Sequence, residues 1–123
     1  MRLLLDSHAF LWFLLDAPKL SPSAEKAIGE AEEVHLSLAS LWELALKRGL
    51  RRLTVHEEPD KMAVRAGFSL LPIKLAHIHV LQTLPQLHRD PFDRMLVAQA
   101  VDEGLVLVTA DTTLQRYPVA WLW

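Results

Sequence analysis

The sequence predicts an α/β fold with three layers, α/β/α, built around a central, mostly parallel sheet of about five strands. Two observations lead to this prediction. Short apolar runs without polar alternation are typical of strands that are buried on both faces. These runs alternate along the chain with segments that carry helical spacing or helix start and stop signals. Such alternation is typical of a parallel sheet with helices on both sides, and we expect a single domain over residues 1–123.

Five short segments are the expected strands, and the run Leu105–Val108 is the clearest of them because it contains only leucine and valine. The strands are expected at residues 2–5, 34–37, 69–73, 105–108 and 119–122.

Seven helices are expected between and after these strands. They cover residues 9–15, 22–33, 39–49, 59–67, 76–84, 91–103 and 112–116. Asp90 and Pro91 form a favourable helix start, as N-cap and first helical residue, and Gly104 is a stop signal. His77 and His79 are expected at the surface of their helix or behind the site.

The composition excludes several classes of protein. The chain has no cysteine, which excludes disulfides and thiolate metal ligands and is typical of a reducing cytoplasm. Its 13 basic and 15 acidic residues lack the basic excess of a protein that coats nucleic acid. The longest apolar run, Ala9–Leu15, is far shorter than the ~18 residues of a membrane span, and no secretory signal is recognised. We expect a cytoplasmic protein with no membrane association.

Four carboxylates from distant parts of the chain are expected to meet at one edge of the sheet. Asp6 and Asp111 come at the ends of hydrophobic strands, and Glu43 lies on the helix that follows the second strand. Asp93 lies in the first turn of the helix that leads into the fourth strand. Right-handed crossovers place the carboxyl ends of parallel strands on one edge, which is where ligands bind.

Such a gathering of negative charge favours a bound cation. Like charges about 4 Å apart repel by several kcal/mol at intermediate dielectric. A hard divalent ion with oxygen ligands, such as Mg²⁺, removes this cost. It can also activate water and neutralise the charge of a phosphate during hydrolysis.

Four sequence motifs have the order and placement of a known family. They are Leu4–His8, Ser40–Leu44, Asp93–Ala100 and Val108–Asp111. Each motif is weak alone, but together they span nearly the whole chain and fall at the expected strand and helix ends. On these residues the sequence resembles the PIN-domain nucleases, especially the small VapC-type ribonuclease toxins of bacterial toxin–antitoxin pairs.

The resemblance implies a Mg²⁺- or Mn²⁺-dependent endoribonuclease that hydrolyses RNA phosphodiester bonds and leaves 5′-phosphate and 3′-hydroxyl ends. Asp6, Glu43, Asp93 and Asp111 match the acidic metal-site residues of the family, with Asp6 and Asp93 as central ligands. The resemblance also implies a homodimer that is inhibited by a cognate antitoxin protein.

Three further residues are expected to support the acids. Thr109 matches the hydroxyl that the family carries next to its last acid, and Ser7 is expected to hydrogen-bond Asp6. Asp90 is expected mainly as the N-cap of its helix, with a second role near the metal left open.

Four residues are candidates for contact with substrate phosphates, namely His88, Arg94, Arg51 and Arg52. The arginines at 51 and 52 could equally be a solvated helix end. Glu43 also has an alternative interpretation, an ion pair with Lys47 four residues later in the favoured direction.

The sequence has features in common with two other functional classes. A receiver-like, Mg²⁺-binding signalling domain needs an Asp after its third strand, but that segment ends Leu71-Pro72-Ile73. It also needs a later Lys, and none follows Lys74. A PIN-type binding module or a DNA-directed nuclease stays as the alternative. The sequence has no added arch or helix-hairpin-helix segment, which favours RNA.

Overall fold

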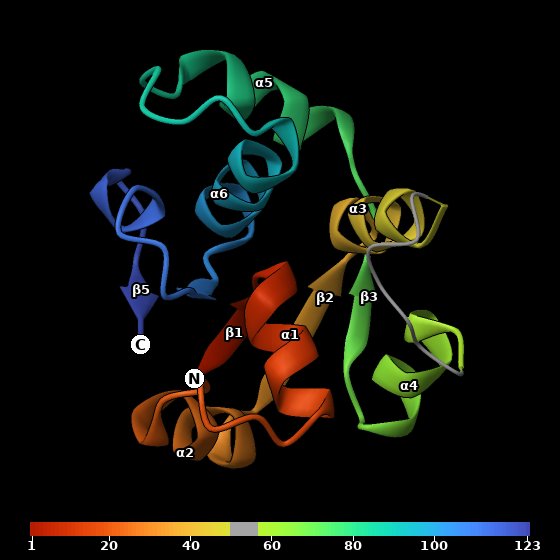
Figure 1. Cartoon of the computed structure of the whole chain (residues 1–123). Coiled ribbons are helices and arrows are strands. Elements are labelled where there is room, and N and C mark those ends of the chain that lie inside the picture. Colours follow the sequence, from red (N-terminus) through yellow and green to blue (C-terminus); the bar gives the residue numbers. More distant parts are fainter. Residues whose placement is uncertain (50–56) are drawn as a thin grey trace.

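The protein is described by a computed structural model that covers residues 1–49 and 57–123 (Figure 1). Its five strands form one sheet in the order β3-β2-β1-β4-β5, and every neighbouring pair is parallel. The strands are β1 (Arg2–Leu5), β2 (Glu33–Ser37), β3 (Ser69–Leu71), β4 (Val106–Val108) and β5 (Trp121–Leu122). The predicted fold class is therefore confirmed.

Helices cover both faces of the sheet. They are α1 (Ser7–Leu14), α2 (Pro22–Glu30), α3 (Leu38–Gly49), α4 (Pro59–Arg65), α5 (Leu75–Thr83) and α6 (Pro91–Glu103), with a short 3₁₀ turn η1 (Leu114–Arg116). In the part of the chain that the structure describes, no helix is both long enough and apolar enough to span a membrane.

The strand β1 separates two hydrophobic layers, because successive side chains of a strand point to opposite faces. Leu3 and Leu5 pack in the layer that holds α1 and α2, with Phe10 as its largest buried ring. Leu4 packs in the other layer, which contains Leu96 and most of the buried face of α6. Burial on both faces explains why these strands read as continuous apolar runs.

Acidic side chains cap the starts of α6 and α1. The Asp90 side chain accepts hydrogen bonds from the backbone N–H groups of Phe92 and Asp93, as the sequence predicted for an N-cap. Asp6 caps α1 in the same way, since it accepts from the N–H of Ala9 at 2.8 Å. At the other end of α6, Gly104 has φ +66° and closes the helix in the left-handed conformation.

Several boundaries differ from the prediction. The first helix begins at Ser7 rather than Ala9, because the Asp6 side chain caps it directly after β1. The second helix ends at Glu30 rather than at residue 33, because the backbone becomes extended at Ala31. The Glu32 N–H then donates to the Met1 carbonyl at 3.0 Å. The third and fifth strands are shorter than predicted.

Candidate metal and active site

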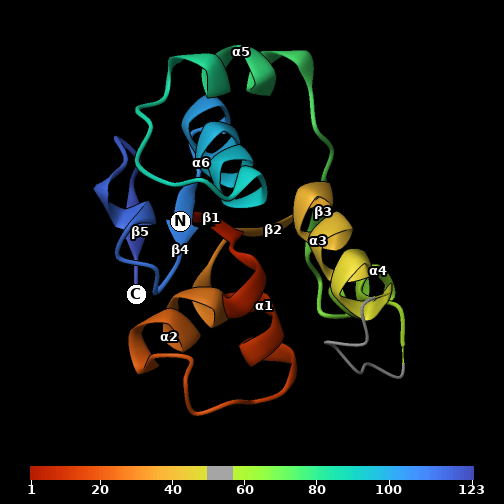
Figure 2. The same cartoon turned by 45° about the horizontal axis from the view of Figure 1, so that its top comes forward.

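The predicted acidic residues come together near the carboxyl end of β1, since Glu43 and Asp6 lie close enough for their charges to act on Asp93, and Asp111 close enough to act on Asp6. That end of β1 lies between α1, α3 and α6 in both views (Figures 1 and 2). Asp6 follows β1 and Asp111 lies just beyond the neighbouring strand β4. Glu43 comes from α3, and Asp93 comes from the first turn of α6.

Asp6 is buried and held from two sides. The Ala9 N–H donates to its Oδ1 at 2.8 Å, and it is hydrogen-bonded to the side chain of Thr109. Burial raises the pKa of the Asp6 carboxyl above its usual range, although these two hydrogen bonds act to lower it. The charge of Asp111 raises this pKa further, so the two acids at the strand ends influence each other.

Glu43 is nearly buried, with 8 % of its surface exposed, yet both of its oxygens have partners. The Ser7 hydroxyl donates to Oε1 at 2.6 Å, and Lys47 Nζ lies 3.2 Å from Oε2. The sequence predicted Asp6 as the partner of Ser7, and this was wrong, because Ser7 lies on α1 facing α3. The ion pair with Lys47 that was left as an alternative is present.

Asp93 is destabilised in its charged form by burial and by its acidic neighbours. Burial raises its pKa, and the negative charges of Asp90, Glu43 and Asp6 raise it further, to about 7. His88 acts in the opposite direction. A carboxyl with this pKa is close to half protonated near neutral pH in the absence of a cation.

His88 bridges two of the acids. Its Nε2 lies 3.2 Å from Asp93 Oδ2 and 3.4 Å from Asp111 Oδ2. Its Nδ1 accepts the backbone N–H of Asp90 at 3.2 Å, so a neutral ring must carry its proton on Nε2 and donate it toward the carboxylates. The backbone N–H of His88 donates to the Tyr117 hydroxyl at 3.0 Å. His88 was predicted only as a possible substrate contact, and it lies within the acidic cluster.

The remaining supporting residues fix the loop after β4. Thr109 is fully buried, and its Oγ1 accepts the backbone N–H of Asp111 at 3.0 Å. Asp111 Oδ1 accepts the N–H of Thr113 at 2.8 Å, which leaves Oδ2 toward His88. Asp111 therefore caps a turn and belongs to the cluster at the same time.

Of the arginines predicted to contact substrate phosphates, the structure describes Arg94. Arg94 Nη2 lies 3.5 Å from the Leu84 carbonyl, and Arg94 lines a cavity of about 420 Å³ together with Arg89 and His88. Arg51 and Arg52 lie outside the described residues.

The chemistry of the cluster fits a hard divalent cation. Asp6, Glu43, Asp93 and Asp111 offer only carboxylate oxygens, the donors that Mg²⁺ and Mn²⁺ prefer. The closest carboxylate oxygens of Asp93 and Asp111 lie within 4.8 Å of each other, and the protonated Nε2 of His88 lies beside both as a hydrogen-bond donor rather than a ligand. The pKa values of Asp6 and Asp93 are raised first by burial and then by the charges of neighbouring acids, and a bound cation would favour their charged forms.

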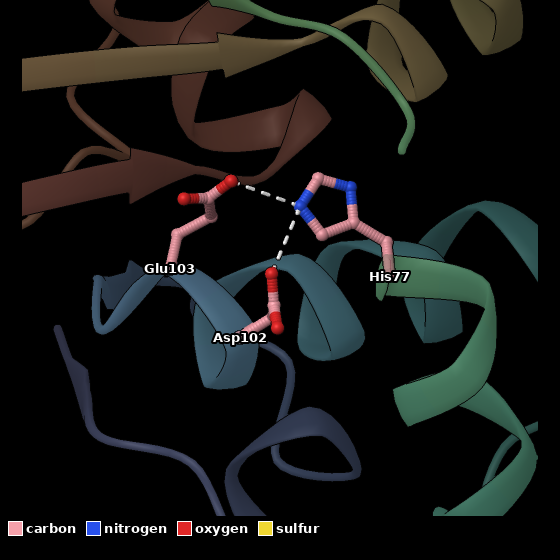
Figure 3. Close-up of side chains that lie close together, drawn as sticks. All are labelled: His77, Asp102 and Glu103. Carbon is pink, nitrogen blue, oxygen red and sulfur yellow. Dashed lines mark hydrogen bonds and ion pairs between the residues drawn. The ribbon is translucent and has the colours of Figure 1, made fainter. Parts of the chain in front are cut away.

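A second cluster joins His77 of α5 to Asp102 and Glu103 at the end of α6 (Figure 3). His77 Nε2 lies 3.1 Å from Glu103 Oε1 and 3.6 Å from Asp102 Oδ2. Lys74 Nζ also forms an ion pair with Glu103 Oε1 at 3.1 Å. The backbone carbonyl of Glu103 accepts a hydrogen bond from the Arg2 guanidinium at the start of β1. The second cluster therefore lies at the opposite edge of the sheet from the acidic cluster.

Hydrogen bonding makes the second cluster a structural link rather than a metal site. His77 Nδ1 accepts the backbone N–H of Lys74 at 3.0 Å. A cation on Nε2 would force the proton of a neutral ring onto Nδ1, where it would face that N–H. The prediction that His77 lies at a helix surface was wrong, because α6 buries the ring completely.

Comparisons with known proteins identify a family with a similar sequence. A family model described as "PIN domain" matches residues 3–120. Ribonuclease VapC22 of Mycobacterium tuberculosis is 28 % identical over 125 residues, which cover 93 % of this chain and 90 % of that protein.

Solved structures share the fold at low sequence identity. VapBC2 from Rickettsia felis, bound to a DNA fragment from its promoter, has a TM-score of 0.74 and 16 % identity, covering 100 % of this chain and 99 % of that one. A toxin–antitoxin complex from Klebsiella pneumoniae has a TM-score of 0.69 and 18 % identity, with 98 % and 96 % covered. FitAcB from Neisseria gonorrhoeae has a TM-score of 0.68 and 20 % identity, again with 98 % and 96 % covered.

Proposed function

Because this chain belongs to the PIN domain family, we propose that it is a Mg²⁺- or Mn²⁺-dependent endoribonuclease and the toxin of a toxin–antitoxin pair. The observation that carries the proposal is the convergence of Asp6, Glu43, Asp93 and Asp111, with the pKa of Asp93 raised to about 7 by burial and by its acidic neighbours. Four oxygen-donating side chains at the carboxyl edge of a parallel sheet suit a metal site that hydrolyses phosphodiesters.

In this proposal Asp6 and Asp93 are the central metal ligands, Glu43 helps to hold the ion or its water, and Asp111 acts directly or through water. When bound, the ion supplies positive charge that stabilises the reacting phosphate and favours deprotonation of a water.

The other residues hold these four acids in place. Ser7 and Lys47 contact the two oxygens of Glu43, which fixes the orientation of this carboxylate. Thr109 orients Asp6, and the Nε2–H of His88 lies between the Asp93 and Asp111 carboxylates. A site of preoriented groups reduces the reorganisation that hydrolysis would otherwise require.

The substrate and partners follow from the family and its relatives. A relative that is named a ribonuclease supports RNA as the substrate, and we place its hydrolysis in the cytoplasm. Structural neighbours that are toxin–antitoxin complexes support a cognate antitoxin as the partner. The basic cavity beside His88, lined by Arg89 and Arg94, is a suitable path for the phosphates of the RNA backbone.

A homodimer is also part of the proposal. Leu38, Trp42 and Leu46 follow one another at four-residue spacing on α3 and are 40 %, 59 % and 48 % exposed. An exposed apolar stripe of this kind is typical of a protein–protein contact surface.

The test is cleavage of single-stranded RNA and DNA by the purified chain, with Mg²⁺, with Mn²⁺ and with chelator. We expect RNA cleavage that requires metal and falls by at least about 100-fold in Asp6→Asn and Asp93→Asn, as for loss of a group that stabilises transition-state charge. Asp102→Asn is the matched control, since Asp102 lies on the same helix as Asp93 but in the second cluster. Cleavage that survives chelation, or that Asp6→Asn retains in full, contradicts the mechanism, and cleavage of DNA alone supports the DNA-directed alternative.

A further inference from the structure

An aromatic stack stands beside the acidic cluster on α1. The rings of His8 and Trp12 have their centroids 5.7 Å apart and their planes at 30°, so they are stacked. The two residues are four positions apart on the helix and therefore lie on the same face, one turn from each other. His8 is exposed, and Trp12 is partly buried.

The stack and the acids share one cavity. A cavity of about 270 Å³ is lined by Asp6, His8, Trp12, Ala110 and Asp111. Two of the four proposed metal-site acids thus border the same space as the two stacked rings.

Trp12 is supported from behind, so the stack has a fixed base. Trp123 meets the Trp12 ring edge-on, with centroids 5.7 Å apart and planes at 61°. Lys19 Nζ lies 5.9 Å from the centroid of the same ring. With Trp12 fixed in this way, the exposed His8 ring is the outer member that can accept another flat group.

We propose that the His8–Trp12 stack binds one unpaired nucleobase of the RNA, next to the phosphate that is cleaved. This inference rests on the proposed ribonuclease function and extends it to how the substrate is held. The stacked rings present a flat face beside the acids, and an unpaired base is neutral and flat and can stack on that face. Stacking of this kind depends little on base identity, because every base has a π-face.

The test combines protein variants with changes in the RNA. The probe is a short single-stranded oligoribonucleotide that the wild-type protein cleaves at a defined bond. A matched series replaces one nucleotide at a time with an abasic ribose, on either side of that bond. The proteins are wild type, His8→Ala, His8→Phe and Trp121→Leu, and kcat/KM is measured with Mg²⁺ for every pair.

We expect one abasic position beside the cleaved bond to lower the wild-type kcat/KM by about fivefold or more, the lower end of the known range for base stacking. His8→Ala should lower kcat/KM on intact RNA by a similar factor, with little further loss on that abasic RNA. His8→Phe should restore the value, since phenylalanine keeps the flat ring and removes the ring nitrogens. Trp121, which is 44 % exposed on β5, is the matched control, and Trp121→Leu should behave as wild type.

Two results overturn the inference. One is that, at every position, the loss of kcat/KM from His8→Ala is the same on the abasic RNA as on the intact RNA. The other is that His8→Phe is as impaired as His8→Ala, which assigns His8 a hydrogen-bonding role. If the wild-type protein cleaves no RNA, the proposed function fails as well, whereas cleavage without coupling to His8 refutes only the stacking site.

Discussion

At the scale of single residues, the site is dominated by the cost of burying carboxylates close to one another. Asp6 and Asp93 have pKa values raised first by burial and then by acidic neighbours, while Glu43 is compensated by Ser7 and Lys47. His88 places a hydrogen-bond donor between Asp93 and Asp111. These contacts relieve part of the repulsion between the carboxylates. The repulsion that remains favours binding of a cation, because a cation would relieve it.

Without metal, we expect the free energy of unfolding to fall as the pH rises from 5 to 7. The pKa of Asp93 is about 7 in the folded protein against a model value of 3.8. Over this interval the folded state holds a proton that the unfolded state has lost, so each pH unit costs about 1 kcal/mol of stability. The penalty is absent below both pKa values and complete above about pH 7. Asp6 is shifted in the same direction and adds to it.

Urea denaturation in chelator at pH 5, 6 and 7 measures this slope. Asp93→Asn removes the titrating group and should flatten the slope, while Asp102→Asn should retain it. A wild-type stability that rises over this interval contradicts the assignment.

We expect Mg²⁺ or Mn²⁺ to raise the thermal unfolding midpoint, because a ligand that binds only the folded state stabilises it. The gain is about 2.7 kcal/mol at a metal concentration 100 times the dissociation constant. Protons compete for Asp93, so the metal affinity should increase from pH 5 to 7. Differential scanning fluorimetry with and without Mn²⁺ tests this, and an equal shift in Asp6→Asn would show that the ion binds elsewhere.

At the scale of single elements, α6 connects the acidic cluster with the second cluster. Its first turn carries Asp93 and its last turn carries Glu103, which binds His77 of α5. Ten residues of helix at 1.5 Å each separate the two clusters by about 15 Å along the axis. The start of α6 depends on Asp90, whose side chain accepts from two backbone N–H groups.

Asp90→Ala should lower the free energy of unfolding by about 1 kcal/mol, since an N-cap is lost. It should also weaken metal binding, because the first turn of α6 positions Asp93. Asp90→Ser keeps a capping oxygen without the charge and should restore most of the stability. Urea denaturation and calorimetric Mn²⁺ titration measure the two effects, and an Asp90→Ala protein with wild-type stability contradicts the capping role.

His77→Ala should destabilise the protein by about 2 kcal/mol or more, because it leaves a cavity and removes a buried partner of Glu103. The cleavage rate at a temperature where the variant stays folded should be close to that of wild type, since the second cluster lies at the other end of α6. His79→Ala is the matched control, because His79 is exposed on the same helix. A strong loss of cleavage in folded His77→Ala would contradict the structural role.

At the scale of the whole molecule, the parallel sheet is what brings distant residues together. The strands β1 and β4 are neighbours although about 100 residues separate them, so Asp6 and Asp111 meet at one edge. The helices α3 and α6 then deliver Glu43 and Asp93 to the same place. The exposed stripe on α3 is the apolar surface to which we assign the proposed homodimer contact.

Leu46→Glu should weaken self-association if the α3 stripe forms the proposed homodimer, because it places a charge in an apolar contact. Size-exclusion chromatography with light scattering measures the molar mass over a dilution series. Val101→Glu is the control, since Val101 is 40 % exposed on α6, away from the stripe. A mass that stays dimeric in Leu46→Glu rules out this surface as the dimer contact.

Much of the fold was predictable because its signals are local. Apolar runs without alternation marked the strands, and the Asp90-Pro91 pair marked the start of α6, as the structure confirms. The parallel order then predicted that Asp6, Glu43, Asp93 and Asp111 would lie near one another. The family resemblance, confirmed by the match over residues 3–120, rests on the same four segments.

The pairing of side chains could be decided only by the tertiary structure. The sequence did not reveal that Ser7 donates to Glu43, that His88 bridges Asp93 and Asp111, or that His77 is buried. The periodicity of a sequence shows which face of an element is buried, because that depends on the residue's own polarity and position. A hydrogen-bond partner on another element depends on how two helices pack and on the direction of each side chain. Those features are fixed only when the whole chain has folded, and they determine how the four acidic side chains are oriented.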